Sequence, residues 1–193
     1  MITALDSIKL LTADIAAAMT MERLLGRPVI AGEESATVRL DNMALDLVAS
    51  EDGREGLAGL AFAIESIDQA QRICERRALN PGAPIGARLG LDMRLDRTEP
   101  KWGARLMFFR AGDLIVEVVH NLAEEPSDKP DQLWGLSWRA ANIEAAHARL
   151  KASAFDVSEI RPGRKPGTRV FTVKNNTLGI PTLILQPASR DGG

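Results

Sequence analysis

The sequence contains no tyrosine, one cysteine and two histidines, and aromatic residues make up only 4% of it. So few rings argue against the base-stacking platforms of single-strand nucleic-acid binders. The single thiol, Cys74, cannot form an internal disulfide, which suits a reducing cytosol. Neither sign of charge dominates, because the net charge is −2. No overall field therefore draws the chain to nucleic acid or to anionic lipid.

Long hydrophobic runs are also missing: none approaches the roughly 20 residues that a transmembrane helix needs. The first residues lack the basic and apolar regions of a signal peptide. We find no Gly-rich phosphate loop, nucleophile elbow or Cys-x-x-Cys pair. The 193 residues, 45% of them hydrophobic, are enough for one large domain or two small ones. These features predict a cytoplasmic protein with neither a membrane nor a nucleic-acid partner.

Hydrophobic periodicity predicts the same succession of elements three times. Each unit opens with a strand, continues with a capped helix and closes with two or three strands. The expected opening strands are 5–11, 56–65 and 133–140, the helices 15–25, 66–79 and 142–150, and the closing hairpins 36–49, 105–120 and 169–186. Further strands are expected at 87–95 and 155–160.

This repetition predicts an α+β fold of βαβββ modules, in cupped, barrel-like mixed sheets with helices outside. Two paired modules would occupy residues 1–121, an acidic linker 122–131, a third module 132–187 and a flexible tail 188–193. Two modules side by side form a concave cup, whereas the third must cover them or pair with another chain. A homodimer with a two-fold axis would solve that problem.

Glu117 lies inside the stretch 114–120, which is apolar on both sides of it. A strand of that kind is expected to be covered on both faces. A carboxylate there costs several kcal/mol unless it is paired, hydrogen-bonded, protonated or metal-bound. Glu117 is therefore expected to be a metal ligand, a general base, or the partner of a cation such as Lys9. Asp46, in a similar strand, is its candidate partner, or an edge residue with local hydrogen bonds.

Three stretches resemble the vicinal oxygen chelate superfamily of glyoxalase I, bleomycin-resistance proteins and extradiol dioxygenases. They are Leu5-Asp6-Ser7-Ile8 with Glu22-Arg23-Leu24-Leu25-Gly26, Gly59 to Ile64 with Ile67-Asp68-Gln69-Ala70, and Asn142 to Leu150 with Lys165 to Phe171. In metal-dependent members, each of two paired modules supplies a ligand from its first strand, often His, and a Glu from its last strand. The resemblance implies a divalent-metal site in the cup.

The resemblance assigns these ligand positions to residues of this chain. The first-strand positions are Ser7, Gly59 and Gly135, and the last-strand positions are Asp46, Glu117 and Leu183. Two modules thus retain a carboxylate, and none has a histidine there. Catalytic zinc usually has about three protein ligands, whereas two carboxylates with waters can hold Mg²⁺ or Mn²⁺ weakly. The expected cofactor is therefore none, or a weakly held divalent ion at Glu117 and Asp46.

The resemblance implies a glyoxalase-like protein with a concave small-molecule site. One interpretation is a lyase or isomerase acting on a small oxygenated or aromatic metabolite, with Glu117 and Asp46 catalytic. Lys9, Trp138 and Trp102 would then contact the substrate. Because most family ligands are missing, whether the chain is an enzyme stays open. The alternative is a metal-free protein that binds and sequesters an apolar small molecule, and a third is a module serving only in assembly.

Other conspicuous residues have plainer interpretations beside the functional ones. Trp138 shares strand parity with Leu136 and alternatively packs under the third helix. Alternation places His120 on the face opposite Glu117, and His147 is expected to pack its helix. The basic residues of the loop 161–169 either clamp an anion or form a solvated hairpin loop.

Overall fold

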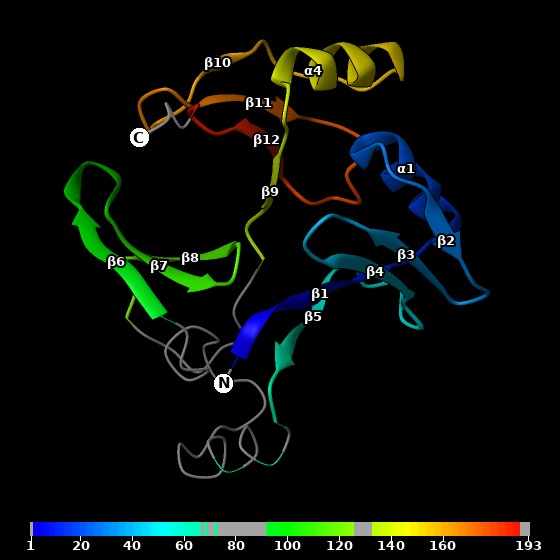
Figure 1. Ribbon diagram of the computed structural model, residues 1–193, viewed down its shortest axis with the longest axis horizontal. Coiled ribbons are helices and arrows are strands. Elements are labelled where there is room, and N and C mark those ends of the chain that lie inside the picture. Colours follow the sequence, from blue (N-terminus) through cyan, green and yellow to red (C-terminus); the bar gives the residue numbers. More distant parts are fainter. Residues whose placement is uncertain (1, 67, 69–71, 73–91, 126–132, 190–193) are drawn as a thin grey trace. The chain divides into compact units, whose positions relative to one another are not determined.

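In the computed structural model, which describes residues 2–66, 68, 72, 92–125 and 133–189, most regular structure is strand (Figure 1). The helices are α1 (Met19–Leu25) and α4 (Ile143–Ala152), with short 3₁₀ segments η1 (Ile15–Ala18) and η2 (Pro100–Trp102). The strands are β1 (Ile2–Thr12), β2 (Val29–Ala31), β3 (Ser35–Arg39), β4 (Ala44–Ala49), β5 (Gly56–Ile64), β6 (Asp92–Glu99), β7 (Ala104–Ala111), β8 (Leu114–Asn121), β9 (Leu136–Arg139), β10 (Arg161–Pro162), β11 (Arg169–Val173) and β12 (Thr182–Gln186). The chain is α+β, as the sequence predicts.

The described strands form three open sheets rather than a closed barrel. Their orders are β2-β3-β4-β1-β5, β10-β11-β12-β9 and β6-β7-β8. In the first and third modules, the opening strand lies beside the last hairpin strand, as β1 beside β4 and β9 beside β12. The β9–β12 pairing is parallel, as expected for strands joined through a helix. This shared order confirms the βαβββ repeat.

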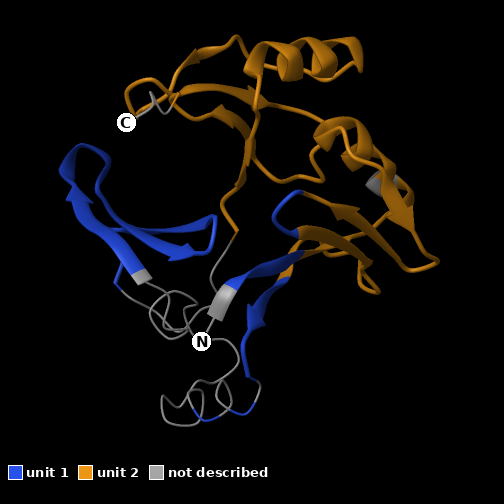
Figure 2. Cartoon of the chain, viewed as in Figure 1, with its two compact units in different colours: residues 1–8, 41–43, 59–132 blue, residues 9–40, 44–58, 133–193 orange. Residues whose placement is uncertain are grey.

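The chain divides into two compact units (Figure 2). Unit 1 consists of Met1–Ile8, Asp41–Met43 and Gly59–Gln132, and unit 2 of Lys9–Leu40, Ala44–Ala58 and Leu133–Gly193. Unit 2 thus combines segments of the first and third modules, and the predicted pairing of modules one and two stays a prediction. Most of the second helix expected at 66–79, Cys74 and most of the linker lie outside the described residues.

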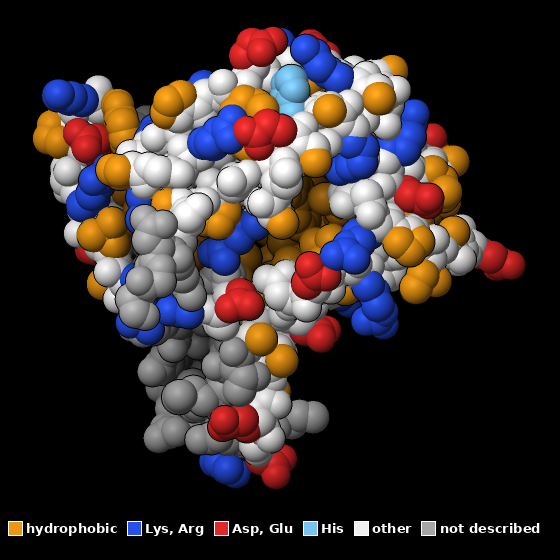
Figure 3. All heavy atoms as spheres, turned by 45° about the horizontal axis from the view of Figure 1, so that its top comes forward, with side chains coloured by type: hydrophobic (Ala, Val, Ile, Leu, Met, Phe, Trp, Pro, Cys, Tyr) orange, Lys and Arg blue, Asp and Glu red, His pale blue; other side chains and the backbone are white. Residues whose placement is uncertain are grey.

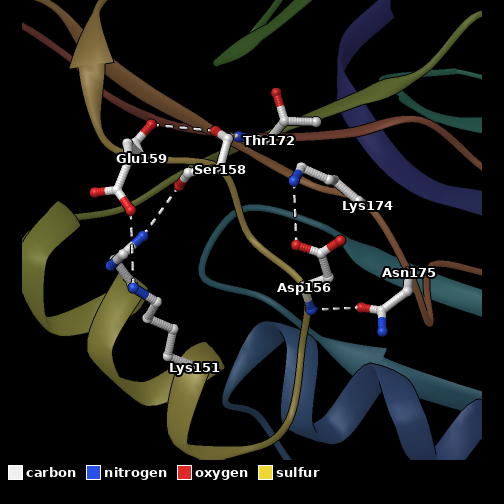
Figure 4. Close-up of polar contacts among 8 residues, drawn as sticks. Lys151, Asp156, Ser158, Glu159, Thr172, Lys174 and Asn175 are labelled. Carbon is white, nitrogen blue, oxygen red and sulfur yellow. Dashed lines mark hydrogen bonds and ion pairs between the residues drawn. The ribbon is translucent and has the colours of Figure 1, made fainter.

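One strand was not predicted, and one predicted strand is wrong. Sequence periodicity misses β2, which is only three residues long. The strand predicted at 155–160 is wrong, because that segment pairs only through a single bridge between Val157 and Val173. Side chains interrupt the ladder there: the Asp156 N–H donates to Asn175 Oδ1 at 2.8 Å and the Thr172 N–H to Ser158 Oγ at 3.0 Å (Figure 4).

The first module buries one face of its β3–β4 hairpin. Cross-strand partners share a face of a sheet, and the pairs Ala36–Leu47 and Val38–Leu45 are all at most 2% exposed. Both strands contact η1, so this is the helix-covered face. After α1, Gly26 turns the chain with φ +66°, and its N–H donates to Glu22 O at 2.8 Å. That conformation favours glycine at a helix end.

In unit 1, one face of the second hairpin has its own small core. Phe109 and Ala111 are 4% exposed, and Phe62, Met107, Val116 and Val118 pack against them. The β7–β8 ladder runs without a register shift from Ala104–Asn121 to Ala111–Leu114. Alternate residues of this hairpin therefore belong to opposite faces.

The third helix begins where the sequence predicts. Asn142 caps α4, since its Oδ1 accepts a hydrogen bond from the Ala145 N–H at 2.8 Å. Gln186 of β12 accepts from the Ile143 N–H at 2.7 Å and satisfies a second free donor of the first turn. Ile143 and Leu150 are fully buried. Local capping and burial together fix α4 on its sheet.

Arg149 of α4 reaches the end of α1 and joins the first and third modules within unit 2. Its guanidinium donates to the carbonyl oxygens of Arg23 and Leu24, the latter at 3.0 Å. Burial lowers the pKa of Arg149. Arg23 in turn lies 5.9 Å from the ring centroid of Phe155. A cation at the carboxyl end of a helix complements its free carbonyls and its dipole.

We therefore expect Arg149→Ala to lower the free energy of unfolding by about 1–3 kcal/mol, because two charge-assisted hydrogen bonds are lost. Urea denaturation followed by circular dichroism measures the change. Lys151→Ala is the matched control: Lys151 lies on the same helix, 3.8 Å from Glu159 in an exposed ion pair. That variant should change stability by less than about 0.5 kcal/mol. Equal effects of the two variants would contradict a capping role for Arg149.

Candidate functional site

Asp46 lies on the open face of the first hairpin. It stands between Leu45 and Leu47, both fully buried on the helix side, so alternation turns Asp46 to the other face. Thr37 is its cross-strand partner, and the Thr37 hydroxyl donates to Asp46 Oδ1 at 2.8 Å. The β4 carboxylate is thus held in one orientation by a neighbouring side chain.

The same register gives Asp46 a partly apolar setting. Ile30 of β2 pairs with Thr37, so Ile30, Thr37 and Asp46 form a row across three strands. Ile30 is 61% exposed, whereas Thr37 and Asp46 are half-buried. One face of the molecule shows hydrophobic side chains at the surface between charged ones (Figure 3). The exposed Ile30 is thus two strands away from Asp46 on the same face, with Thr37 between them.

Glu117 is exposed, and the expectation that its strand is covered on both faces is wrong. Val116 and Val118 pack against the core of unit 1, but Ile115 on the Glu117 side is 43% exposed. The Glu117 face is open near the turn, whereas Leu106, the partner of Val119 farther along that face, is only 3% exposed. Glu117 therefore needs no buried partner, and within the described residues it makes no ion pair with Lys9 or another cation.

The last strands of the three hairpins carry the residues that the resemblance assigns as ligand positions. In the second hairpin Glu117 pairs with Phe108, which pairs with Leu95, so this acid has apolar residues on the two neighbouring strands. In the third hairpin Leu183 pairs with Thr172. Counted from the turn, Asp46 belongs to the third cross-strand pair, Glu117 to the fourth and Leu183 to the second. The equivalence of these positions, which the resemblance implies, stays a prediction. Because Asp46 belongs to unit 2 and Glu117 to unit 1, their pairing across a cup stays a prediction.

The other predicted contact residues are dispersed. Lys9 is exposed and Trp102 is 47% exposed, so both are accessible to a ligand. Trp138 pairs with Ile184, which pairs with Phe171, and Phe171 contacts His147 of α4. This register places Trp138 on the face under α4, the alternative position that its parity with Leu136 predicts. The roles of these three residues in ligand binding stay predictions.

Both histidines lie where alternation and helix geometry place them. His120 pairs with Arg105 and is on the face opposite Glu117. His147 packs edge-on against Phe171, with ring centroids 5.0 Å apart, and its Nε2 lies 3.0 Å from Ser158 O. His147 is thus a helix-packing residue, which confirms its prediction.

Sequence reasoning missed Thr37, the residue that orients Asp46. The pattern contained the information, because counting outward from the turn at residues 41 and 42 pairs position 37 with position 46. A hydroxyl opposite a carboxylate on adjacent antiparallel strands lies within hydrogen-bonding reach. The register of the hairpin therefore identifies Thr37 as the hydrogen-bond partner of Asp46.

A further hollow lies among the turns of unit 1. It is a cavity of about 270 Å³ lined by Ala4, Leu5, Asp41, Asn42, Met43, Ala111, Gly112, Asp113 and Leu114. Its aspartates are exposed turn residues, and none of the predicted site residues lines it. It is therefore distinct from the hairpin faces that carry Asp46 and Glu117.

The donor set does not fit a three-ligand metal centre. Among the residues that the structure describes, no three His, Cys, Asp or Glu side chains lie together as a potential metal site. Ser7, at the first-strand ligand position, is 2% exposed and offers only a hydroxyl. Soft and borderline ions such as zinc prefer imidazole and thiolate ligands. We therefore derive no chemistry through a bound metal.

Comparison with known proteins supports the fold. No family model and no curated protein matches the sequence. A xylose isomerase-like TIM barrel/4-hydroxyphenylpyruvate dioxygenase fusion protein matches all of this chain and 50% of its own, with a TM-score of 0.66 and 10% identity. Methylmalonyl-CoA epimerase from Mycobacterium tuberculosis matches with 12% identity over 98% of this chain and 91% of its own, at a TM-score of 0.41. Lactoylglutathione lyase from Agrobacterium tumefaciens matches with 12% identity over 95% and 92%, at 0.43.

These similarities bear on architecture alone, and the first carries the argument because only its TM-score exceeds 0.5. Together with the βαβββ strand order, it confirms a fold of the vicinal oxygen chelate type. In the described part of the chain, neither helix is long and apolar enough to span a bilayer. Function has to be argued from the side chains on the open faces.

We predict that the dialysed protein holds no stoichiometric zinc and that a chelator leaves its melting temperature unchanged, because the donor set falls short of three ligands. Elemental analysis and thermal-shift measurements check this. Millimolar Mn²⁺ should raise the melting temperature only if Asp46 and Glu117 hold an ion weakly, and Asp46→Asn should then abolish that shift. One zinc per chain, released by chelator with a fall in melting temperature, would overturn the prediction.

Proposed function

We propose that this protein binds a small oxygenated or aromatic metabolite on the open faces of its hairpins and acts on it as a glyoxalase-like lyase or isomerase. The observation that carries the proposal is the half-buried Asp46 carboxylate, oriented by the Thr37 hydroxyl on the face opposite the buried leucines, in a row that also carries the exposed Ile30. The fold is compatible with this use but does not establish it.

The chemistry we assign to Asp46 is proton transfer. Thr37 donates to Oδ1, and Oδ2 has no donor among the described residues. The free oxygen can accept a proton from a carbon next to a carbonyl group, as a general base does. The carboxylic acid so formed on Asp46 returns the proton to the same or the neighbouring carbon, which regenerates the carboxylate. Glu117 of the second module would be a second base, and Lys9 and Trp102 would contact the substrate.

The test measures exchange of carbon-bound hydrogen for deuterium in D₂O by proton NMR, with 2-oxobutanoate and hydroxyacetone as probes. We expect the native protein to accelerate exchange and Asp46→Asn to slow it on the order of 100-fold or more. Glu117→Gln should also slow exchange. Thr37→Val should have a smaller effect, because it misorients the base without removing it. Asp113→Asn, which alters an exposed turn, is the control.

Full activity in both Asp46→Asn and Glu117→Gln would refute the catalytic assignment. Saturable binding of either probe without any exchange would instead support sequestration, the non-enzymatic alternative. Circular dichroism of each variant verifies that the fold is intact, which is expected because Asp46 and Glu117 are at least partly exposed.

We also propose that the protein forms a homodimer, since three modules leave one without a counterpart. Sedimentation equilibrium at micromolar concentration should give about twice the mass of the 20.9 kDa chain. A stable monomer under those conditions would remove the dimer and require the third module to complete its cup within one chain.

A further inference from the structure

The open face of the third sheet carries an arginine at each end of one transverse row. Arg161 of β10 pairs with Val170, Val170 with Leu185, and Leu185 with Arg139 of β9. Directly paired residues share a face, so these four side chains lie on the same side of the sheet. Neighbouring strands are about 4.8 Å apart, which separates the two arginine backbones by roughly 14 Å.

This row points away from α4. The adjacent row, Trp138–Ile184–Phe171, has the opposite parity, and Phe171 is the residue that His147 of α4 contacts. Arg139 and Arg161 are both exposed. Between them Val170, next to Arg161, is only 4% exposed and lies under the loop at Gly163, whereas Leu185 and Leu183 are half-buried and Thr172 lies beside Leu183. The accessible apolar part of the face is therefore Leu185 and Leu183. The face thus resembles a shallow apolar strip with a guanidinium at either edge.

The charges of this module are unbalanced. Residues 133–189 contain eight Lys and Arg but only three Asp and Glu, although the whole chain has a net charge of −2. Each of the three acids already has a cation: Glu144 pairs with Arg169, Asp156 with Lys174 and Glu159 with Lys151. Figure 4 shows the latter two pairs. Bonding to Arg169 also lowers the pKa of Glu144.

Arg139 and Arg161 are left without a carboxylate partner among the described residues. The last strand of this module has Leu183 where the other two have Asp46 and Glu117, so the face carries no acid of its own at that place. The basic residues of the loop 161–169 therefore have different roles. Arg169 is committed to Glu144, whereas Arg161 faces the open side.

The backbone that carries Arg161 is well fixed. The Gly163 N–H donates to Thr168 O at 2.8 Å, and Thr168 is 8% exposed. A Cβ at Gly163 would collide with Thr168 and lie 3.4 Å from Val170 Cγ1, so this loop is packed directly onto the row. A cation on a fixed support loses less entropy on binding than one on a mobile loop.

We propose that this face binds an amphiphilic anion, a small molecule with a carboxylate or phosphate group on an apolar body. The guanidinium of Arg139 or Arg161 recognises the anionic group through paired N–H donors, which match carboxylate and phosphate geometry. Leu183 and Leu185 contact the apolar body. A dianion of suitable length engages both arginines. This site is independent of the proton-transfer chemistry assigned to Asp46.

Isothermal titration calorimetry with octanoate and octyl phosphate tests the proposal and distinguishes the two anionic groups. Octanol and inorganic phosphate supply the body and the charge separately, and both should bind more weakly than the combined probes. Arg139→Gln and Arg161→Gln should each weaken binding on the order of tenfold, since each removes a charge-assisted contact. Leu183→Glu, which restores an acid to the face, should abolish it.

Lys151→Gln is the matched control, because it removes one positive charge from the same module on the helix side. If it weakens binding as much as Arg139→Gln, the effect is one of overall charge and the proposal fails. Equal binding of octanol and octanoate would also overturn it. Tight binding of duplex DNA that depends on both arginines would identify a polyanion surface instead and would likewise reject the small-molecule site.

Discussion

The alternation of side chains along three hairpins determines which residues meet a helix and which meet solvent. In the first hairpin Leu45 and Leu47 go under the helix layer and Asp46 between them does not. In the third hairpin Phe171 and Ile184 face α4, while Val170 and Leu185 face away. A one-residue slip of register would exchange these sets. The register that buries the leucines therefore also places the candidate site residues.

The three modules use this constraint with different chemistry. Burial on the helix side requires apolar residues, and it repeats in the first and third copies. The other side has no such requirement: Asp46 lies there in the first copy, and Leu183 with the arginine row lies there in the third. Because the residues on the open face can differ while those on the covered face stay apolar, one fold can carry an acid in one copy and a pair of arginines in another.

Much of the architecture could be predicted because its determinants are local. Asn142 before an amphipathic stretch and Gly26 after one fixed the helix ends, and hydrophobic alternation located the hairpins. The covered state of the strand around Glu117 could not be predicted in this way. A run with valine or isoleucine on both sides of an acid has the same letters whether one face or both are packed, and only the tertiary neighbours decide.

The candidate site divides along the same line. Asp46 and Glu117 could be chosen from their unusual setting within apolar strands. Predicting the role of Thr37 requires the pairing register of the hairpin. Predicting the ion pair of Arg169 with Glu144, which are 25 residues apart, requires knowing that the helix packs against the sheet. The prediction of a strand at 155–160 is wrong for a related reason. The side chains of Asn175 and Ser158 accept hydrogen bonds from backbone N–H groups that a strand ladder would have used.

Arg149 and Leu24 are 125 residues apart in the sequence, yet the Arg149 guanidinium donates a hydrogen bond to the Leu24 carbonyl oxygen. During synthesis, α1 leaves the ribosome before Arg149 does. The carbonyl oxygens at the end of α1 therefore lack this donor until most of the chain has been made. Closing so long a loop is entropically slow. A messenger truncated before the third module would yield a first module that lacks this cap, and degradation of the incomplete chain by cellular proteases would be the natural result.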